Sequence, residues 1–200
     1  MNAESAADTA DVFAMTPEEL REEVLRLREK LIRAEWTVAE LEERADVDPM
    51  LDVFNRRGFE RELARSIAFV KRYGTPAVLM YVDLDGFKTV NDRHGHAAGD
   101  ALLKAVVADL VRNLRASDVV GRLGGDEFGA LLWNTHPEQA AVKAATLETL
   151  IEKVAVAYDD AVLGCGASAG VVALDPASDP AAMIALADRA MYARKRERRG

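Results

Sequence analysis

The sequence has little of what secreted and membrane proteins are made from. Only one cysteine, Cys165, occurs among the 200 residues, so no disulfide framework can form, and a reducing compartment is the simpler expectation. No apolar run approaches the roughly 18 residues that a membrane-spanning helix needs, and the acidic start of the chain lacks the basic segment that opens a signal peptide. These absences predict a soluble, cytoplasmic protein without a membrane partner, in which Cys165 is a packed core residue.

Positive charge is scarce as well. Lys and Arg number 26 against 34 Asp and Glu, which leaves a net charge of −8. An acidic surface repels polyanions, so nucleic acid and anionic membranes are not expected as general partners, although a local basic patch is compatible with this balance. With 50% hydrophobic and 30% charged residues, the chain can bury one globular core and has a short remainder to spare.

That remainder lies at the N-terminus. Residues 1–15 are small and acidic, and we expect them to form a disordered tail. Thr16 then supplies a helix N-cap, followed by Pro17 at the first helical position and by Glu19 three residues after the cap. Beyond the cap, apolar or small residues recur in alternating steps of four and three, at Leu20, Val24, Leu27, Leu31, Ala34, Val38, Leu41 and Ala45. This heptad pattern predicts a coiled-coil helix over residues 16–46.

The residue types within the heptads favour two parallel strands. β-Branched side chains fall mostly at the a positions and leucine mostly at the d positions. The flanking charges agree, since Glu23 at a g position would face Arg28 of a partner helix. Lys30 and Glu35 repeat this pairing one heptad later. We therefore expect a homodimer; the alternative is a single amphipathic helix that lies on its own domain.

Residues 47–200 alternate between helical and extended patterns and predict one α/β domain. A nearly unbroken apolar run at 77–83 has the character of a central strand covered on both faces. Further strands are expected at 118–123, 127–133 and 165–174, and helices at 55–73, 101–116, 137–157 and from 179 onward, with a loop and a short helix after the first strand. The core order, β-α-β-β-α-β, is the ferredoxin-like arrangement with extra helices at both ends.

This order brings acidic residues together. In a ferredoxin-like sheet the first and third strands are antiparallel neighbours, so the end of the first meets the start of the third. Asp83 ends the first predicted strand, and Asp126 and Glu127 begin the third. Like charges at such a short distance are costly unless a cation neutralises them, and oxygen-only ligands suit Mg²⁺, with Mn²⁺ as an alternative. Carboxylates that present a metal to a triphosphate are the arrangement used for in-line displacement at phosphorus.

The motifs around these acids resemble those of a known family. The segments RLGGDEF at 122–128, DLDGFKTVNDRHGHAAGD at 83–100 and NRRGF at 55–59 closely resemble the GGDEF family of diguanylate cyclases, which join two GTP molecules into cyclic di-GMP. The resemblance covers residues 48–200 and implies a nucleotidyl-cyclase-like fold. Two glycines followed by acids are also ordinary turn chemistry, but their combination with Asp83 and with residues 91–100 excludes that interpretation.

The resemblance implies a role for each matching acid. Asp83 would hold the metal, helped by the backbone carbonyl of Leu84. Asp126 and Glu127 match the family's acidic pair, which is implicated in metal binding and in activating the attacking hydroxyl. The sequence leaves open which of these two does which.

Contacts with the phosphates are implied in the same way. Gly124 and Gly125 lack Cβ atoms, so their turn can let GTP lie against the backbone. Phe87 and Lys88 belong to a short loop that leads into a helix, where free N–H groups and the lysine can cradle phosphates.

Further positions match the family's contacts with the base and the triphosphate. Asn91 and Asp100 match guanine readers, and a carboxylate at Asp100 can accept hydrogen bonds from the N1–H and the amine of guanine. His96 matches a position beside the base, with a packed or surface histidine as the alternative. Lys195 and Arg199 match triphosphate-binding cations, whereas their basic segment taken alone indicates a solvated helix end.

Two more segments bear on regulation. Arg115 and Asp118 match the family's RxxD inhibitory site, which binds the cyclic product, and an arginine fork can meet guanine O6 and N7 together. The alternative is an arginine that ends a helix and only pairs with Asp118. Before the first domain helix the chain departs from the family, since Leu51 and Asp52 stand where many members have Thr and Gly.

The predicted function is therefore a homodimeric diguanylate cyclase, with GTP as substrate and cyclic di-GMP as product and inhibitor. One alternative is a non-catalytic GGDEF module that binds GTP or cyclic di-GMP as a signalling switch. Such modules usually lose signature acids or phosphate contacts, which this chain retains. A second alternative, a coiled-coil adaptor with a structural domain, gives no reason for these residues to converge.

Overall fold

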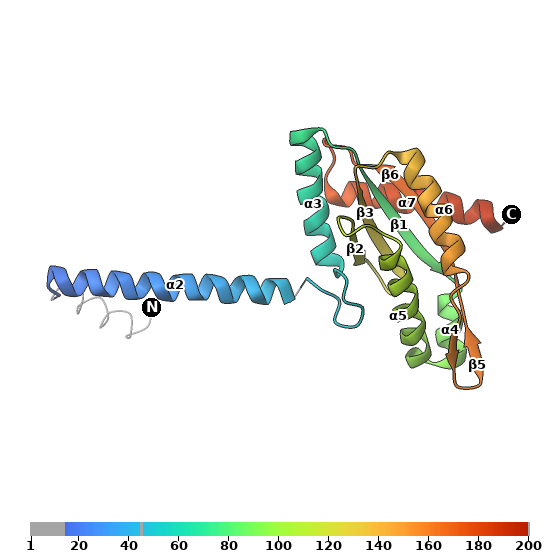
Figure 1. Cartoon of the computed structure of the whole chain (residues 1–200), viewed down its shortest axis with the longest axis horizontal. Helices are drawn as coiled ribbons and strands as arrows, with labels where there is room; N and C mark the ends of the chain where they lie inside the picture. Colours follow the sequence, from blue (N-terminus) through green and yellow to red (C-terminus); the bar gives the residue numbers. More distant parts are fainter. Residues whose placement is uncertain (1–14, 45, 200) are drawn as a thin grey trace. The chain divides into compact units, whose positions relative to one another are not determined.

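The structure is a computed structural model that describes residues 15–44 and 46–199, with side chains for 15–36 and 46–198 (Figure 1). The chain divides into two compact units, residues 1–45 and 46–200. The second unit begins one residue before the predicted boundary. Most of the predicted tail, residues 1–14, lies outside the described residues.

The described part of the first unit is one long helix, α2 (Pro17–Arg44). Its start has the predicted capping box, in which the Thr16 backbone N–H and hydroxyl donate to the Glu19 carboxylate at 2.7 and 2.8 Å. The Glu19 N–H donates back to Thr16 Oγ1 at 3.3 Å. These bonds satisfy N–H groups that a helix start otherwise leaves without partners, so the predicted N-terminus of the helix is confirmed.

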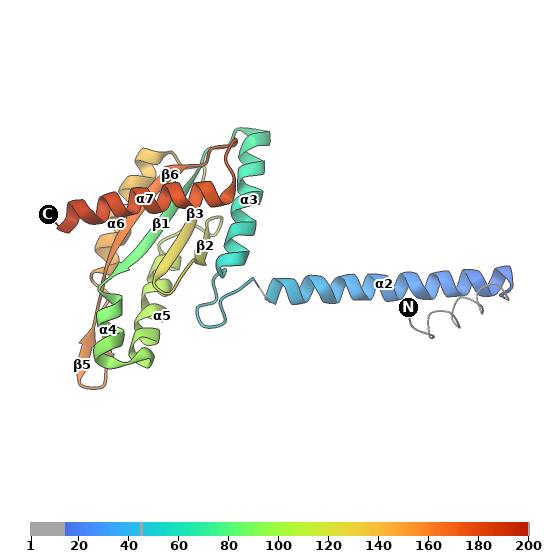
Figure 2. The same ribbon diagram turned by 180° about the vertical axis from the view of Figure 1, so that it is seen from behind.

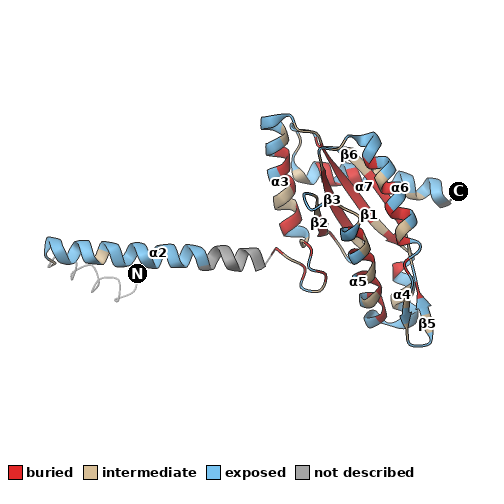
Figure 3. Ribbon diagram, in the orientation of Figure 1, coloured by how far each residue is buried: buried red, intermediate tan, exposed pale blue. Residues whose placement is uncertain are grey.

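The apolar seam of α2 is exposed, as the pale blue ribbon of Figure 3 shows. The leucine and valine side chains of the seam that the structure describes are 36% to 59% exposed, at Leu20, Val24, Leu27 and Leu31. Val38 and Leu41 lie beyond the described side chains, and Ala45 lies outside the described residues. A second exposed apolar set, Leu25, Ile32 and Trp36, lies outside the predicted seam. The coiled coil itself stays a prediction.

One charge of α2 is paired within the helix. Arg26 Nη2 lies 2.6 Å from Glu23 Oε1, and Arg26 Nε donates to Glu23 Oε2 at 2.7 Å. This is the carboxylate that the heptad pattern predicts to face Arg28 of a partner helix. Exposed ion pairs of this kind contribute only about 0.3–0.5 kcal/mol to stability. The pair with Arg26 therefore does not prevent Glu23 from pairing with Arg28 of a partner helix.

The second unit is built on a four-stranded sheet with the order β2-β3-β1-β6, in which all neighbours are antiparallel. The strands are β1 (Ala77–Asp85), β2 (Val119–Arg122), β3 (Glu127–Trp133) and β6 (Gly166–Ala173). This order confirms the ferredoxin-like arrangement. β1 continues two residues beyond its predicted end at Asp83 and so includes Asp85.

Helices cover both faces of the sheet. They are α3 (Arg56–Tyr73), α4 (Phe87–His94), α5 (His96–Arg112), α6 (Pro137–Ile151) and α7 (Pro180–Arg199). Figures 1 and 2, drawn from opposite sides, show α5 and α6 on one face and α3 and α7 on the other. Val78 and Met80 of β1 therefore belong to one core, and Leu79 and Tyr81 to the other. Two covered faces explain the unbroken apolar run in β1.

The ends of α3 were predicted correctly from sequence. Asn55 caps its start, because the side-chain oxygen accepts a hydrogen bond from the Gly58 N–H at 3.0 Å. Gly74 ends it with a φ of 68°, and its N–H donates to the Val70 carbonyl at 2.8 Å. This left-handed conformation is the reason for a glycine at the helix end.

The prediction for residues 137–157 was wrong at its end. α6 stops at Ile151, and a hairpin follows that consists of β4 (Val156–Tyr158) and β5 (Ala161–Leu163). Asp159 turns this hairpin with a φ of 48°. The segment between α6 and the hairpin has no glycine or proline to mark the stop, and Val154 and Val156 fit a strand as well as a helix face. None of the described helices is long and apolar enough to cross a membrane.

Candidate active site

The strand register places the acids of two distant segments side by side. Asp83 and Glu127 are Cα partners across the antiparallel pair of β1 and β3. The Leu84 N–H donates to the Asp126 carbonyl at 3.1 Å, so the backbone pairing extends into the turn before β3. The predicted meeting of the first and third strands at Asp83 is thereby confirmed. Leu84 as a whole is only 2% exposed, and its side chain belongs to the core, so the backbone carbonyl is the one group of this residue that could act as a ligand.

The two signature acids have different surroundings. Burial raises the pKa of Asp126 above its ordinary value, and the negative charge of Asp83 raises it further. Glu127 lies against Tyr81 of the same sheet face, and burial together with the Glu127 carboxylate, to which the hydroxyl donates, raises the pKa of Tyr81. Asp126 is therefore the acid that is crowded by another carboxylate, whereas Glu127 has a neutral hydroxyl beside it.

A lysine bridges the two acids at the end of β1. Lys195 of α7 forms ion pairs with Asp83 and with Asp85, in the latter case at 2.9 Å from Oδ1. The buried Ser168 hydroxyl of β6 donates to Asp85 Oδ2 at 2.6 Å. Although burial acts to lower it, hydrogen bonds from the ammonium to the two carboxylates raise the pKa of Lys195. The structure therefore places the predicted triphosphate cation on the acids themselves.

Asp85 and Ser168 were missed by the sequence analysis. Asp85 had a usable signal, because side chains two residues apart on a strand share a face, and Asp83 is two residues earlier. Ser168 had none, since its contact depends on the pairing of β6 with β1. The partly buried Cys165 adjoins this group, and burial, followed by Asp85 and Asp126, raises the pKa of its thiol to about 11.

The residues present fit a divalent cation. In the part of the chain that the structure describes, no three acidic, histidine or cysteine side chains are already arranged as a metal centre. However, Asp83 attracts a lysine ammonium, and the pKa of Asp126 is raised because Asp83 adds to the effect of burial. Oxygen donors that carry excess negative charge suit Mg²⁺ or Mn²⁺.

The glycine turn before β3 is fixed by Arg122, which the sequence analysis also missed. Arg122 donates to the Gly124 carbonyl through Nε at 3.0 Å and to the Gly125 carbonyl through Nη2 at 2.8 Å. Its Nη1 lies 3.1 Å from Asp48 Oδ2, in the segment that follows α2. A Cβ atom at Gly124 would collide with the Glu127 carboxylate, whereas nothing lies within 4 Å of one at Gly125. Gly124 therefore makes room for an acid, and Gly125 leaves room for a ligand.

The predicted base readers lie on α4 and α5. Asn91 is half-buried, and its Oδ1 has no hydrogen-bond partner among the described residues. A Cβ atom at Gly99 would collide with this Oδ1, so the glycine in α5 allows Asn91 its position. Asp100 and His96 are exposed, which excludes the packed alternative for the histidine.

Three other predicted contacts differ in accessibility. Phe87 is 6% exposed and its ring belongs to the core, so only its backbone can serve a phosphate. Lys88, at the second position of α4, is exposed. Arg199 is the last residue of α7, and its side chain lies outside the described ones.

The RxxD segment adjoins a separate pocket of about 210 Å³. The lining residues come from the loop before β2, the end of β3 and the start of α6: Arg115, Asp118, Leu132, Thr135, Gln139 and Lys143. Asp118 accepts hydrogen bonds from the backbone N–H groups of Arg115 at 3.0 Å and Trp133 at 3.2 Å. Among the described residues no ion pair joins the Arg115 guanidinium to Asp118. The carboxylate fixes the loop, and the arginine side chain is exposed.

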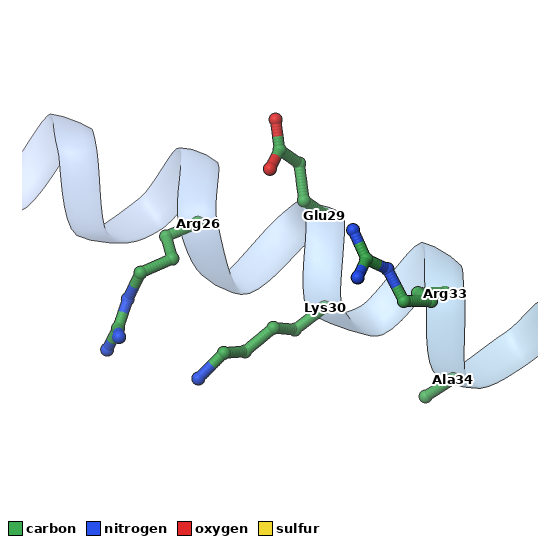
Figure 4. Close-up of a pocket in the computed structure, with 5 residues that line it drawn as sticks. All are labelled: Arg26, Glu29, Lys30, Arg33 and Ala34. Carbon is green, nitrogen blue, oxygen red and sulfur yellow. The ribbon is translucent and has the colours of Figure 1, made fainter.

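A surface hollow of about 460 Å³ lies along α2. Its lining residues, Arg26, Glu29, Lys30, Arg33 and Ala34, all belong to this one helix. Figure 4 shows Arg26 and Lys30 projecting from one side of the helix and Glu29 from the opposite side. Side chains that diverge from a single helix do not enclose a ligand, so this hollow is not a candidate site.

Comparisons with known proteins agree with this geometry. The family described as "Diguanylate cyclase, GGDEF domain" matches residues 45–200. The probable diguanylate cyclase DgcE of Escherichia coli K12 is 39% identical over 157 residues, which are 78% of this chain but only 14% of DgcE.

Solved structures show the same fold. A sensory box/GGDEF family protein from Caulobacter crescentus CB15 is 34% identical, with a TM-score of 0.70 and coverage of 76% of this chain and 99% of the other. The GGDEF domain of DgcB from Caulobacter crescentus, in complex with c-di-GMP, is 26% identical, with a TM-score of 0.72 and coverage of 76% and 91%. The family match to residues 45–200 covers more than half of this chain. The chain therefore belongs to the GGDEF-domain family of diguanylate cyclases.

Proposed function

We propose that the chain is a diguanylate cyclase that condenses two GTP molecules into cyclic di-GMP and releases two pyrophosphates. The observation that carries the proposal is the register of β1 and β3, which sets Asp83 beside Glu127 and the glycine turn. The relative DgcE is described as a probable diguanylate cyclase, and the DgcB domain was solved with c-di-GMP. These names support the same chemistry for this chain.

Asp83, Asp126, Glu127 and the Leu84 carbonyl would hold Mg²⁺ or Mn²⁺. When bound, the cation would supply positive charge that stabilises the phosphoryl oxygens during displacement. The crowding of Asp126 by Asp83 supports this assignment, because a cation would relieve it.

The protein side chains would hold the substrate and move its proton. Lys195 would exchange its contact with Asp83 for the triphosphate, and Lys88, at the start of α4, would meet the same anion. Asn91 and Asp100 would bind guanine, and Gly125 would leave the space that the nucleotide needs. Each half of the reaction is an attack by the 3′-hydroxyl of one GTP on the α-phosphorus of the other, with pyrophosphate as leaving group.

Asp126 is suited to accept the hydroxyl proton. Burial is the larger cause of its raised pKa, and this cause remains when a cation offsets the charge of Asp83, so the carboxylate would be a stronger base than that of an ordinary aspartate. Two successive displacements close the ring, because each GTP acts once as nucleophile and once as electrophile. Glu127 differs from Asp126 because it accepts a hydrogen bond from the Tyr81 hydroxyl, which restrains its carboxylate. Glu127 is therefore the better candidate for a metal ligand with a fixed position.

One domain would hold one nucleotide, so two domains must face each other. A parallel dimer through α2 would raise the effective concentration of one domain near the other, and the exposed seam of α2 supports such a dimer. The pocket beside Arg115 and Asp118 would bind cyclic di-GMP and restrain the domains, which would give feedback inhibition.

The function is tested by incubation of the full chain with GTP and Mg²⁺, followed by separation of the nucleotides. Cyclic di-GMP and pyrophosphate are expected in a ratio of one to two. Bound product is first removed, so that inhibition at Arg115 does not mask turnover. If GTP binds but no cyclic di-GMP forms, the chain is a binding module and the proposal is wrong.

A further inference from the structure

A buried acid lies outside the site described so far. Glu148 of α6 is only 4% exposed, although carboxylates are almost never buried without partners. Its Oε1 accepts a hydrogen bond from the Ala169 N–H of β6 at 2.9 Å. Its Oε2 lies 3.2 Å from Arg194 Nη2 and 3.2 Å from Arg198 Nη1, both on α7. One carboxylate thus joins a helix, a strand and a second helix.

The same cluster covers the free edge of the sheet. β6 is an edge strand, with β1 as its one neighbour. Arg198 donates to the Ala167 carbonyl, and the Ala169 N–H is taken by Glu148, so side chains satisfy backbone groups that an edge strand leaves open. Arg198 also pairs with Glu152, the exposed C-cap residue of α6.

Two short connections lead from this cluster to the catalytic acids. Ser168 stands between the two anchored residues of β6, and its hydroxyl holds Asp85. Lys195 directly follows Arg194 on α7 and pairs with Asp83 and Asp85. The cluster therefore fixes both the strand that supports Asp85 and the helix turn that carries Lys195.

We propose that Glu148 is a positioning residue for the substrate-binding end of α7. The last apolar anchor of this helix in the core is Met191, and terminal helix turns fray unless they are tied down. Glu148 ties them through two arginines that are four residues apart, and Lys195 lies between these arginines in the sequence. The inference deepens the proposed function, because it rests on the role of Lys195 toward the triphosphate.

The test compares Glu148→Gln with Glu152→Gln in the full chain. Glutamine at 148 keeps an oxygen for the Ala169 N–H but loses the charge that holds both arginines. Amide hydrogen exchange over residues 192–198 is expected to rise at least about five-fold in Glu148→Gln and to stay within about two-fold in Glu152→Gln. The KM for GTP is expected to rise about ten-fold while kcat changes less than about two-fold. Unchanged exchange in Glu148→Gln overturns the proposal, whatever the chain does with GTP.

A double variant separates positioning from general stability. If Glu148 acts through Lys195, then Glu148→Gln adds little to the KM increase of Lys195→Ala, whereas independent effects would multiply. Multiplied effects overturn the proposal. If Glu148→Gln does not fold, Arg194→Gln replaces it and is expected to change exchange and KM in the same direction, because Glu148 then keeps only Arg198. A wild-type chain that forms no cyclic di-GMP would refute the proposed function, while the exchange result would still decide the positioning role.

Discussion

Helix α2 and the domain at 46–200 both contain side chains in unfavourable surroundings. In α2 these are apolar side chains exposed to water, and in the domain they are carboxylates close to one another. Val24 and Leu31 of α2 are 46% and 59% exposed, whereas the leucines and valines of the domain core are 9% exposed or less. The domain instead has crowded acids, with Asp126 beside Asp83. Exposed apolar residues are stabilised by another apolar surface, and crowded acids by a cation. The difference supports two separate proposals, that α2 pairs with a second helix and that the acids of the domain bind a cation.

The largest effect should come from removing the charge of Asp126. Asp126→Asn is expected to lower cyclic di-GMP formation by about 1,000-fold or more, because it removes a candidate base and metal ligand. Its melting temperature should be unchanged or higher. Because the pKa of Asp126 is raised in the folded state, this group makes folding less favourable as the pH rises through the folded pKa, and asparagine removes that effect.

Turnover assays and thermal unfolding between pH 4 and pH 8 measure both outcomes. A variant that keeps its turnover would show that the acid pair has been misplaced. A variant with a lower melting temperature would show that Asp126 stabilises the domain, and the comparison with α2 would fail.

The same substitution in both regions should have very different costs. Leu102→Ala, on the buried face of α5, is expected to lower the free energy of unfolding of the domain by about 2–5 kcal/mol. Leu25 is 60% exposed and lies on α2 outside the seam. Leu25→Ala is therefore expected to change the free energy of unfolding by less than about 0.5 kcal/mol. Urea denaturation measures both values. Similar costs would mean that Leu25 is covered in solution and that the second apolar set of α2 has its own partner.

Removal of α2 should separate catalysis from folding. A chain that starts at residue 46 is expected to keep the domain's melting temperature within a few degrees but to lose about ten-fold or more of its turnover at micromolar concentration. Turnover per chain should then rise with protein concentration, since the domains must meet by diffusion. Equal turnover with and without the helix at low concentration would refute a role for α2 in dimerisation.

A small effect is expected near the start of the domain. Asp52 has a φ of 53° and stands at the position where the resemblance to the GGDEF family implies glycine. Asp52→Gly should stabilise the domain by about 0.5 kcal/mol, whereas Asp52→Val should destabilise it by about 1–2 kcal/mol, because β-branched residues are poorly tolerated in this conformation. Chemical denaturation of both variants provides the measurement. The idea fails if valine is tolerated as well as glycine.

The elements that the sequence predicted well are those with a strong local signal. The apolar run of β1, the cap at Thr16 and the helix at 55–73 all depend on a few adjacent residues. The sheet order followed from these elements because few topologies satisfy them. The hairpin after Ile151 was missed because α6 ends without a stop signal.

Contacts between distant segments were the other limit. Arg122 pairs with Asp48 in the segment before α3, and Ser168 holds Asp85 across the pairing of β6 with β1; no local pattern reveals either contact. Glu148 could be noticed in the sequence, because it stands within the apolar stripe of α6 formed by Ala144, Leu147 and Ile151. A charged residue inside such a stripe indicates a buried ion pair, but the sequence gives no means of finding its partners on α7.

Arg122 has a further consequence for how such a chain can be controlled. It joins Asp48, near the first residue of the domain, to the two glycine carbonyls of the signature turn. One side chain thus holds the start of the domain and the glycine turn together. If two domains are paired through α2 as proposed, the pairing can act on the separation of the two turns while the bonds of Arg122 within each domain stay as they are.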